Sequence, residues 1–451
     1  MPYLDRVLNG LLAGDNVVWQ VDAVDNYKPF VRSFVASALA GGRRLVYFRF
    51  ARHPELVPEG SGAEIHALSP DAGFETFTAR IHKVIEEAGR GACYVFDCLS
   101  DLAVDWYSDL MLGNFFMVTC PYLYEMETFT YFALLRDGHS FECVSSIRGT
   151  TQILIDVFRH DKRMYIHPLK VDRRHSTTMY LPHRWEGESF QPVTESAVLS
   201  EVLGDIDRRA ADAVPRTLDL WDRKFLQERV QPDKAAPGAA AGGERAATFQ
   251  RDLRMMVTRD ERLIDLASRW LDPSDLQAIR RRMIGTGLIG GKSVGMLLAR
   301  AILSKADPAW GERLEKHDSF FIGSDVFYTF LVHNGCWHAR REQRNPGSFL
   351  AGASAARERV RAGTFPAFVV DQFVAMLEYF GQSPIIVRSS SLLEDSFGNA
   401  FTGKYESVFC PNQGSPQERL ESFLSAVREV HRGRMAPVDL QRVDVHPLVV
   451  S

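Results

Sequence analysis

Residues 386–409, IVRSSSLLEDSFGNAFTGKYESVF, combine the residue types that a phosphate-binding site needs. An apolar run delivers Arg388 and the hydroxyls of Ser389, Ser390 and Ser391, and a small-residue loop then leads to Thr402, Gly403 and Lys404. A guanidinium offers fixed fork donors, and a glycine turn lets backbone N–H groups converge beside a lysine charge. The stretch predicts a polyphosphate cradle; the alternative is a plain hairpin with a solvated charged loop.

Two carboxylates, Glu394 and Asp395, lie between the arginine and the glycine loop. We interpret them as helix caps or as partners that orient Arg388, in preference to direct magnesium ligands. The serines are interpreted as hydrogen-bond donors to phosphate, because no histidine stands nearby in the sequence to act as a base. No catalytic residue and no metal ligand is therefore assigned.

A second candidate anion site lies at residues 284–299, where several glycines precede Lys292 and an apolar helical run. The pattern is typical of a loop that opens into a helix N-terminus, which attracts anions. The alternative is a plain helix connection with a solvated lysine. The stretch is not a Walker A motif, because Gly291 follows Gly290 and puts Lys292 one place late, and the preceding segment reads as a helix.

The N-terminal part alternates apolar strands with helices. We expect a helix at about 30–39 and strands at 17–21, 45–50, 93–96 and near 115–119. This alternation predicts an α/β fold with a parallel sheet covered on both faces. Further along, residues 196–230 read as helical and residues 231–247, QPDKAAPGAAAGGERAA, as a linker.

The composition bounds the class of protein. A chain of 451 residues with 45% hydrophobic and 24% charged residues indicates a globular protein of two or three domains. A net charge of −4 gives no global basic field, so nucleic acid is not expected as a partner. Six scattered cysteines without a CxxC pair, no secretory signal and no membrane-length apolar run lead us to expect a cytoplasmic protein without a membrane partner.

The two phosphate-site stretches together resemble the pyruvate phosphate dikinase and phosphoenolpyruvate synthase family, specifically its N-terminal AMP/ATP-binding domain of ATP-grasp type. The resemblance rests on Gly290, Gly291 and Lys292 as a GGKG-like loop and on residues 387–390, Val-Arg-Ser-Ser, followed by an acid and a small-residue loop at 401–404. It covers about residues 255–430, and Ser293 stands where the family loop has glycine at its fourth position.

That resemblance implies ATP with Mg²⁺ as the bound cofactors. Lys292, Arg388 and Ser389 would contact the nucleotide phosphates, and Thr402, Gly403 and Lys404 would form the loop over them. The acidic magnesium-binding lobe of the family should follow residue 430, and no acidic cluster stands there. We therefore expect nucleotide binding without complete phosphoryl transfer.

The N-terminal region resembles the RecA/KaiC-like P-loop ATPases, with Asp97 placed like their Walker B acid. Where that family requires GxxxxGK[ST], residues 22–29 read DAVDNYKP, which keeps Lys28 but has no glycine and no magnesium-binding hydroxyl. We expect a degenerate ATPase fold that does not hydrolyse ATP, with an unrelated α/β domain as the alternative. A protein partner or oligomer would use this region.

The sequence thus predicts four segments: a RecA-like domain at 1–195, a helical connector and linker at 196–247, an incomplete AMP/ATP-binding α+β domain at 248–430, and an atypical tail at 431–451. The first functional hypothesis is an ATP-binding protein of the phosphotransferase class, incomplete as a catalyst. The second is a non-catalytic regulatory or interaction protein that retains both folds. A P-loop ATPase that works through Lys28 is the weakest.

Overall fold

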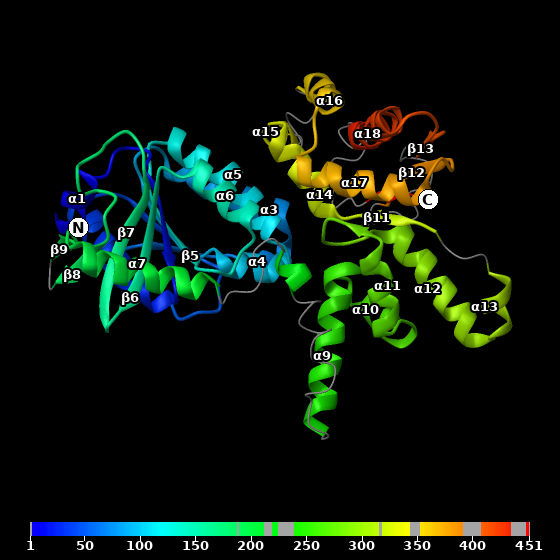
Figure 1. Cartoon of the computed structure of the whole chain (residues 1–451), viewed down its shortest axis with the longest axis horizontal. Coiled ribbons are helices and arrows are strands. Elements are labelled where there is room, and N and C mark those ends of the chain that lie inside the picture. The colour runs from blue at the N-terminus through cyan, green and yellow to red at the C-terminus, as the bar shows by residue number, and fades with distance from the viewer. Residues whose placement is uncertain are drawn as a thin grey trace. The chain divides into compact units, whose positions relative to one another are not determined.

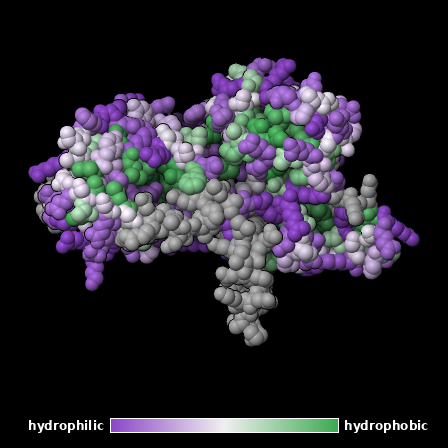
Figure 2. All heavy atoms as spheres, in the orientation of Figure 1, coloured by the Kyte–Doolittle hydropathy of each residue, from purple (hydrophilic) through white to green (hydrophobic). Residues whose placement is uncertain are grey.

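The computed structural model describes residues 2–186, 189–211, 219–223, 239–314, 318–342, 352–390, 407–433 and 448–450. The chain divides into two compact units, Met1–Val230 and Gln231–Ser451. Both units mix helices with strands, so the predicted α/β class is confirmed (Figure 1). Hydrophilic residues cover much of the visible surface of each unit (Figure 2).

The first unit is built on a nine-stranded sheet of order β3-β2-β4-β5-β1-β6-β7-β8-β9. Strands β3 to β6 in this order are parallel, and β7, β8 and β9 continue the sheet antiparallel. The strands are β1 (Asn16–Val21), β2 (Leu45–Arg49), β3 (Glu64–Ala67), β4 (Cys93–Cys98), β5 (Phe129–Leu135), β6 (Ile153–His160), β7 (Arg163–Val171), β8 (His183–Glu186) and β9 (Ser189–Pro192).

Helices cover both faces of this sheet, as its buried apolar strands require. On one face Trp19 of β1 stacks on Phe30 of α2, and on the other Phe96 of β4 packs against Phe115 of α5. The helices are α1 (Pro2–Leu8), α2 (Lys28–Ala40), α3 (Phe74–Ala88), α4 (Ser100–Trp106), α5 (Asp109–Glu125), α6 (Phe141–Thr150) and α7 (Ser196–Ala211), with short 3₁₀ turns η1 (Val24–Asn26) and η2 (Pro70–Ala72).

One expected strand is wrong. The apolar run near 115–119 lies inside helix α5, and the strand that follows β4 in the chain is β5. Helix α5 buries Phe115, Phe116, Val118, Thr119 and Cys120 in succession. A helix that is buried on nearly all sides shows no 3.6-residue periodicity, so its sequence resembles that of a buried strand.

The second unit contains a five-stranded mixed sheet of order β10-β11-β14-β12-β13. Its strands are β10 (Met283–Ile284), β11 (Phe320–Ile322), β12 (Ile385–Ser389), β13 (Ser407–Cys410) and β14 (Leu448–Val450). Its helices are α9 (Ala239–Met256), α10 (Glu261–Trp270), α11 (Pro273–Arg281), α12 (Gly291–Ala306), α13 (Ala309–Arg313), α14 (Ser324–His333), α15 (Trp337–Glu342), α16 (Ala353–Ala362), α17 (Ala367–Phe380) and α18 (Pro416–Gly433).

Two features of this unit bear on the predicted segment boundaries, which remain predictions. Helix α9 begins at Ala239, inside the segment predicted as linker. Strand β14 comes from the predicted tail and pairs with β11 on one side and β12 on the other. No single helix in the described parts of the chain is long and apolar enough to cross a membrane, and α16 with α17 pass that test only as a pair bent by 63°.

Candidate functional site

Strand β12 presents Arg388 to solvent. Val387 and Ser389 on either side of it are buried, whereas Arg388 is exposed, as the two-residue alternation of a strand requires. The strand is held on both sides, because Arg388 pairs in register with Ser407 of β13 and with Val449 of β14. The predicted strand that delivers the arginine is therefore present, and it is fixed by two neighbours.

The glycine-rich loop leads into helix α12, also as predicted. The loop follows the two-residue strand β10, which the sequence did not reveal, and Gly290 stands at the N-cap with a φ of 85°. A positive φ of this size favours glycine, which has no Cβ to clash. Lys292 is the second residue of the helix, beside the partial positive charge of the helix N-terminus. Gly290, Gly291 and Lys292 thus form the helix start that the motif predicted.

The start of this loop is fastened to the N-terminus of helix α14. Thr286 donates its backbone N–H to Oδ1 of Asp325 at 2.8 Å and its hydroxyl to Oδ2 at 2.9 Å. Gly285, with a φ of 71°, packs so closely that an added Cβ would lie 2.5 Å from Val326 and 2.6 Å from Asp325. Burial raises the pKa of Asp325 to about 6, and its hydrogen bonds to Thr286 oppose that rise. The sequence did not single out this carboxylate.

The two stretches meet through a pair of serines. Ser390, directly after strand β12, accepts the backbone N–H of Ser293 at 3.2 Å, and the two hydroxyl oxygens lie 3.0 Å apart. Ser293 is the residue after Lys292, and Ser390 stands two residues after Arg388. The structure therefore brings together two blocks that lie about a hundred residues apart in the chain.

The remaining predicted site residues, Thr402, Gly403 and Lys404, lie outside the described residues, as do Glu394 and Asp395. The described part of the site therefore consists of the helix start at residues 290–293 and the strand end at residues 388–390. Asp325 contacts the adjoining loop, but it is buried and committed to Thr286, which makes it a poor ligand for the Mg²⁺ that the resemblance implies.

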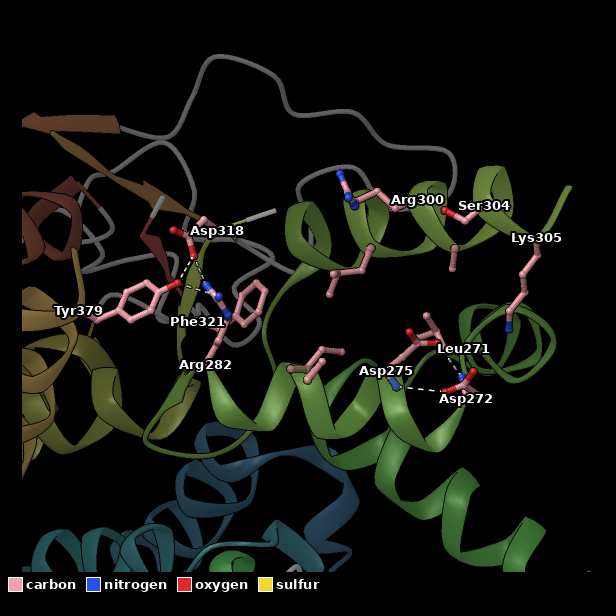
Figure 3. Close-up of a pocket in the computed structure, with 14 residues that line it drawn as sticks. Leu271, Asp272, Asp275, Arg282, Arg300, Ser304, Lys305, Asp318, Phe321 and Tyr379 are labelled. Atoms are coloured by element: carbon pink, nitrogen blue, oxygen red, sulfur yellow. Dashed lines mark hydrogen bonds and ion pairs between the residues drawn. The ribbon is translucent and has the colours of Figure 1, made fainter. Parts of the chain in front are cut away.

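A separate pocket of about 880 Å³ lies along helices α11 and α12 in the second unit (Figure 3). Within it Arg282 forms an ion pair with Asp318 and donates to the Tyr379 hydroxyl at 3.0 Å (Figure 3). Lys305 donates to the carbonyl of Trp270 at 2.7 Å. None of the predicted phosphate-binding residues that the structure describes is among the residues lining it. Because the predicted phosphate-binding residues lie elsewhere and Arg282 is already paired with Asp318, the pocket is not assigned to the nucleotide.

In the first unit, ion pairs occupy the turn where a phosphate-binding loop would stand. Lys28 pairs with Asp25 at 2.7 Å, and Asp22 accepts a hydrogen bond from Arg136 at 2.7 Å. Arg136 also forms an ion pair with the buried Asp156. In open α/β sheets ligands bind beyond the carboxyl ends of the strands. Beyond the ends of β1 and β5, next to Asp156 of β6, the chain places its own charges.

Asp97, the residue placed like a Walker B acid, is also committed to the chain. It is fully buried and accepts hydrogen bonds from Arg49 at 2.6 Å and from the backbone N–H groups of Phe50 and Ala51, each at 2.8 Å. The Tyr47 hydroxyl donates to its other oxygen. These hydrogen bonds use both oxygens of Asp97 to join the ends of β2 and β4, so the carboxylate has little remaining capacity to bind a metal ion.

The first unit also contains a Ser-His-Asp chain that the sequence did not reveal, because its members come from three elements. His139 lies 2.7 Å from Ser100 Oγ through Nε2 and 2.7 Å from Asp109 Oδ1 through Nδ1. Ser100 is only 6% exposed, and its Oγ accepts the N–H of Leu135, while Asp109 also accepts from Arg223 at 2.9 Å. We interpret this chain as a buried structural network, because a serine nucleophile needs access to its substrate.

Comparison with known families identifies part of the second unit. Residues 286–437 match the family model for the AMP/ATP-binding domain of pyruvate phosphate dikinase. No curated protein matches the chain. The match covers about a third of the sequence and includes the helix start at Lys292 and the strand end at Arg388. Residues 286–437 are therefore similar to the AMP/ATP-binding domain of pyruvate phosphate dikinase.

Proposed function

We propose that this chain is an ATP-binding protein of the phosphotransferase class, related to phosphoenolpyruvate synthase and pyruvate phosphate dikinase, and that it binds nucleotide without completing phosphoryl transfer. The single observation that carries the proposal is the meeting of the Lys292 helix start with the Arg388 strand end through Ser293 and Ser390, inside the matched domain.

The proposed roles follow from the chemistry of the two cations. Lys292 would contact a phosphate beside the N-terminus of α12, where the helix dipole adds attraction for an anion. The exposed Arg388 would contact the polyphosphate with its planar fork of donors. The loop residues Thr402, Gly403 and Lys404 complete the proposed site. The side chain of Ser389 is buried and alternates with Arg388 along β12, so no phosphate contact is proposed for it. No metal-dependent step is proposed, because the carboxylate that contacts the described loop is committed to Thr286.

Isothermal titration of the whole chain with ATP and magnesium tests this proposal. We expect Lys292→Ala and Arg388→Ala each to weaken ATP binding about tenfold or more, since a hydrogen bond to a charged group contributes roughly 1.5–3 kcal/mol. Two cations outside the proposed site serve as controls: Lys83→Ala in the first unit and Arg262→Ala on helix α10, both exposed. Unchanged affinity in both site variants would contradict the proposal.

The second candidate is a regulatory or interaction protein that uses nucleotide binding as a signal. The internal ion pairs around Arg136 and Asp97 in the first unit favour it, because they leave that unit a folded scaffold with its expected phosphate position filled. An assay for AMP together with phosphate or pyrophosphate separates both of these roles from that of an active phosphotransferase. Turnover that is lost in Lys292→Ala would show a complete enzyme and contradict both, whereas ATP binding without turnover is the result that both roles predict.

A further inference from the structure

Helix α12 starts without a cap from its own chain neighbours. Its N-cap residue is Gly290, which has no side chain and makes no side-chain cap hydrogen bond. The first N–H groups of a helix have no partner within the helix, and a serine, threonine or aspartate at the N-cap normally accepts one from the second or third helical residue. Glycine is needed here for its positive φ, so the capping group has to come from elsewhere.

Ser390 occupies the position of the missing cap. Its Oγ accepts the N–H of Ser293, which is the third residue of α12, and lies 3.0 Å from the Ser293 hydroxyl. The exposed fractions of Ser293 and Ser390 are 1% and 0%, so water does not compete for these bonds. An N-cap side chain makes the same bond to the third helical N–H, but Ser390 reaches it from the end of strand β12.

We propose that Ser390 caps helix α12 from strand β12 and that this cap, reinforced by the Ser293 hydroxyl, sets the position of Lys292 relative to Arg388. Ser293 and Ser390 are then positioning residues of the nucleotide site, an inference that rests on the proposed function. Each serine stands within two residues of one of the cations. A change in the distance between the two serines therefore changes the distance between the Lys292 ammonium group and the Arg388 guanidinium group.

The pair also accounts for the departure of this sequence from the GGKG-like loop. Glycine at position 293 could still donate its N–H to Ser390 but could not make the hydroxyl contact. Ser293 adds that second bond. The cap and the added bond can be separated by mutation, because Ser390→Ala removes both interactions and Ser293→Ala removes only one.

Titration of the full chain with ATP and with adenosine tests the positioning role. We expect Ser390→Ala to weaken ATP binding about three- to tenfold, of the order of a lost cap, and Ser293→Ala to weaken it less. The double variant should match Ser390→Ala, since the Ser293 hydroxyl has then already lost its partner. Adenosine affinity should not change, because it has no phosphate for the cations to bind. Ser268→Ala on α10, whose hydroxyl bonds within its own helix, is the matched control.

Two further measurements separate positioning from a loss of folding. The double variant Lys292→Ala with Ser390→Ala should bind ATP as tightly as Lys292→Ala alone. If Ser390→Ala instead disrupted the structure in general, the double variant would bind ATP more weakly than Lys292→Ala. Ser390→Thr, which keeps the hydroxyl, should restore most of the affinity. Equal ATP affinities for wild type and Ser390→Ala, with affinity lost in Lys292→Ala, would overturn the positioning role and leave the proposed function standing.

Hydrogen exchange of the backbone amides tests the Ser390 cap directly, and it does so whether or not the protein binds ATP. Ser390→Ala should speed exchange at the Ser293 amide and around the start of α12, because the buried acceptor is gone. If wild type does not bind ATP, the proposed function fails and the positioning role fails with it. Unchanged exchange at Ser293 would overturn the cap itself.

Discussion

At the scale of single residues, the described site depends on contacts between polar side chains that sequence patterns do not reveal. Lys292 and Arg388 are recognisable because a lysine after glycines and an arginine at a strand end are typical of phosphate sites. Asp325, Ser293 and Ser390 act through contacts with distant residues, and only the folded chain brings their partners near. The sequence marked Ser390 only as a hydrogen-bond donor to phosphate and Ser293 only as a departure from the family loop, and it did not mark Asp325. Neither spacing nor composition could reveal the contacts that these residues make.

Asp325 gives a prediction about pH. Burial raises its folded-state pKa from 3.8 to about 6, so the folded state holds this proton to higher pH than the unfolded state does. Its contribution to the free energy of unfolding therefore falls as pH rises from about 4 to 6, and the loss persists above pH 6. Asparagine does not titrate, so the free energy of unfolding of Asp325→Asn should rise relative to that of wild type by about 2 kcal/mol between pH 4.5 and 7.5.

Urea unfolding at the two pH values measures this difference. Any constant effect of the substitution on the bonds to Thr286 cancels, because only the change between pH values is compared. The exposed Asp265→Asn on α10 controls for the loss of one negative charge. A difference between Asp325→Asn and wild type that stays constant with pH would contradict the raised pKa.

At the scale of elements, the sequence predicted those with a clear period or cap. The first strands, helix α2 and helix α11 before the glycine-rich loop were found. Helix α5 was mistaken for a strand because burial on nearly all sides removes its periodicity. The two-residue β10 and three-residue β14 are too short for any pattern, and only pairing with distant strands defines them.

Strand β14 gives a prediction at this scale. It is a central strand, in which Val449 pairs with Phe321 of β11 and with Arg388 of β12. A proline has no N–H to donate and is tolerated in sheets mainly at edges. We expect Val449→Pro to lower the free energy of unfolding of the second unit by about 1–3 kcal/mol, the cost of leaving a buried backbone acceptor without its hydrogen bond, and to weaken ATP binding, because Arg388 loses a neighbouring strand.

The matched control is Val408→Pro in β13, the strand at the end of this sheet. Urea unfolding and ATP titration of both variants make the comparison. The central substitution should cost clearly more stability than the substitution in β13. Equal effects in the two strands would argue against a central position for β14.

At the scale of the whole molecule, the chain has one unit built on a large, mostly parallel sheet and a second unit that contains the segment similar to the AMP/ATP-binding domain of pyruvate phosphate dikinase. The α/β class followed from alternating strands and helices, and the nucleotide domain from two motifs in the right order. The RecA-like assignment of the first unit stays a prediction. The sequence could not predict that Arg49 pairs with Asp97 or that Arg136 pairs with Asp22 and Asp156, because each pair joins residues from different strands or strand ends.

The final prediction concerns which unit responds to ATP. Lys28 is the lysine expected of a phosphate loop, yet it pairs with Asp25, and the neighbouring Asp22 is bound to Arg136. A phosphate there would have to displace these ion pairs and approach two carboxylates, which repel it. We expect Lys28→Ala to keep the ATP-induced rise in melting temperature and any phosphate release, and Lys292→Ala to lose the rise. The reverse pattern, with the response lost only in Lys28→Ala, would move the nucleotide site to the first unit.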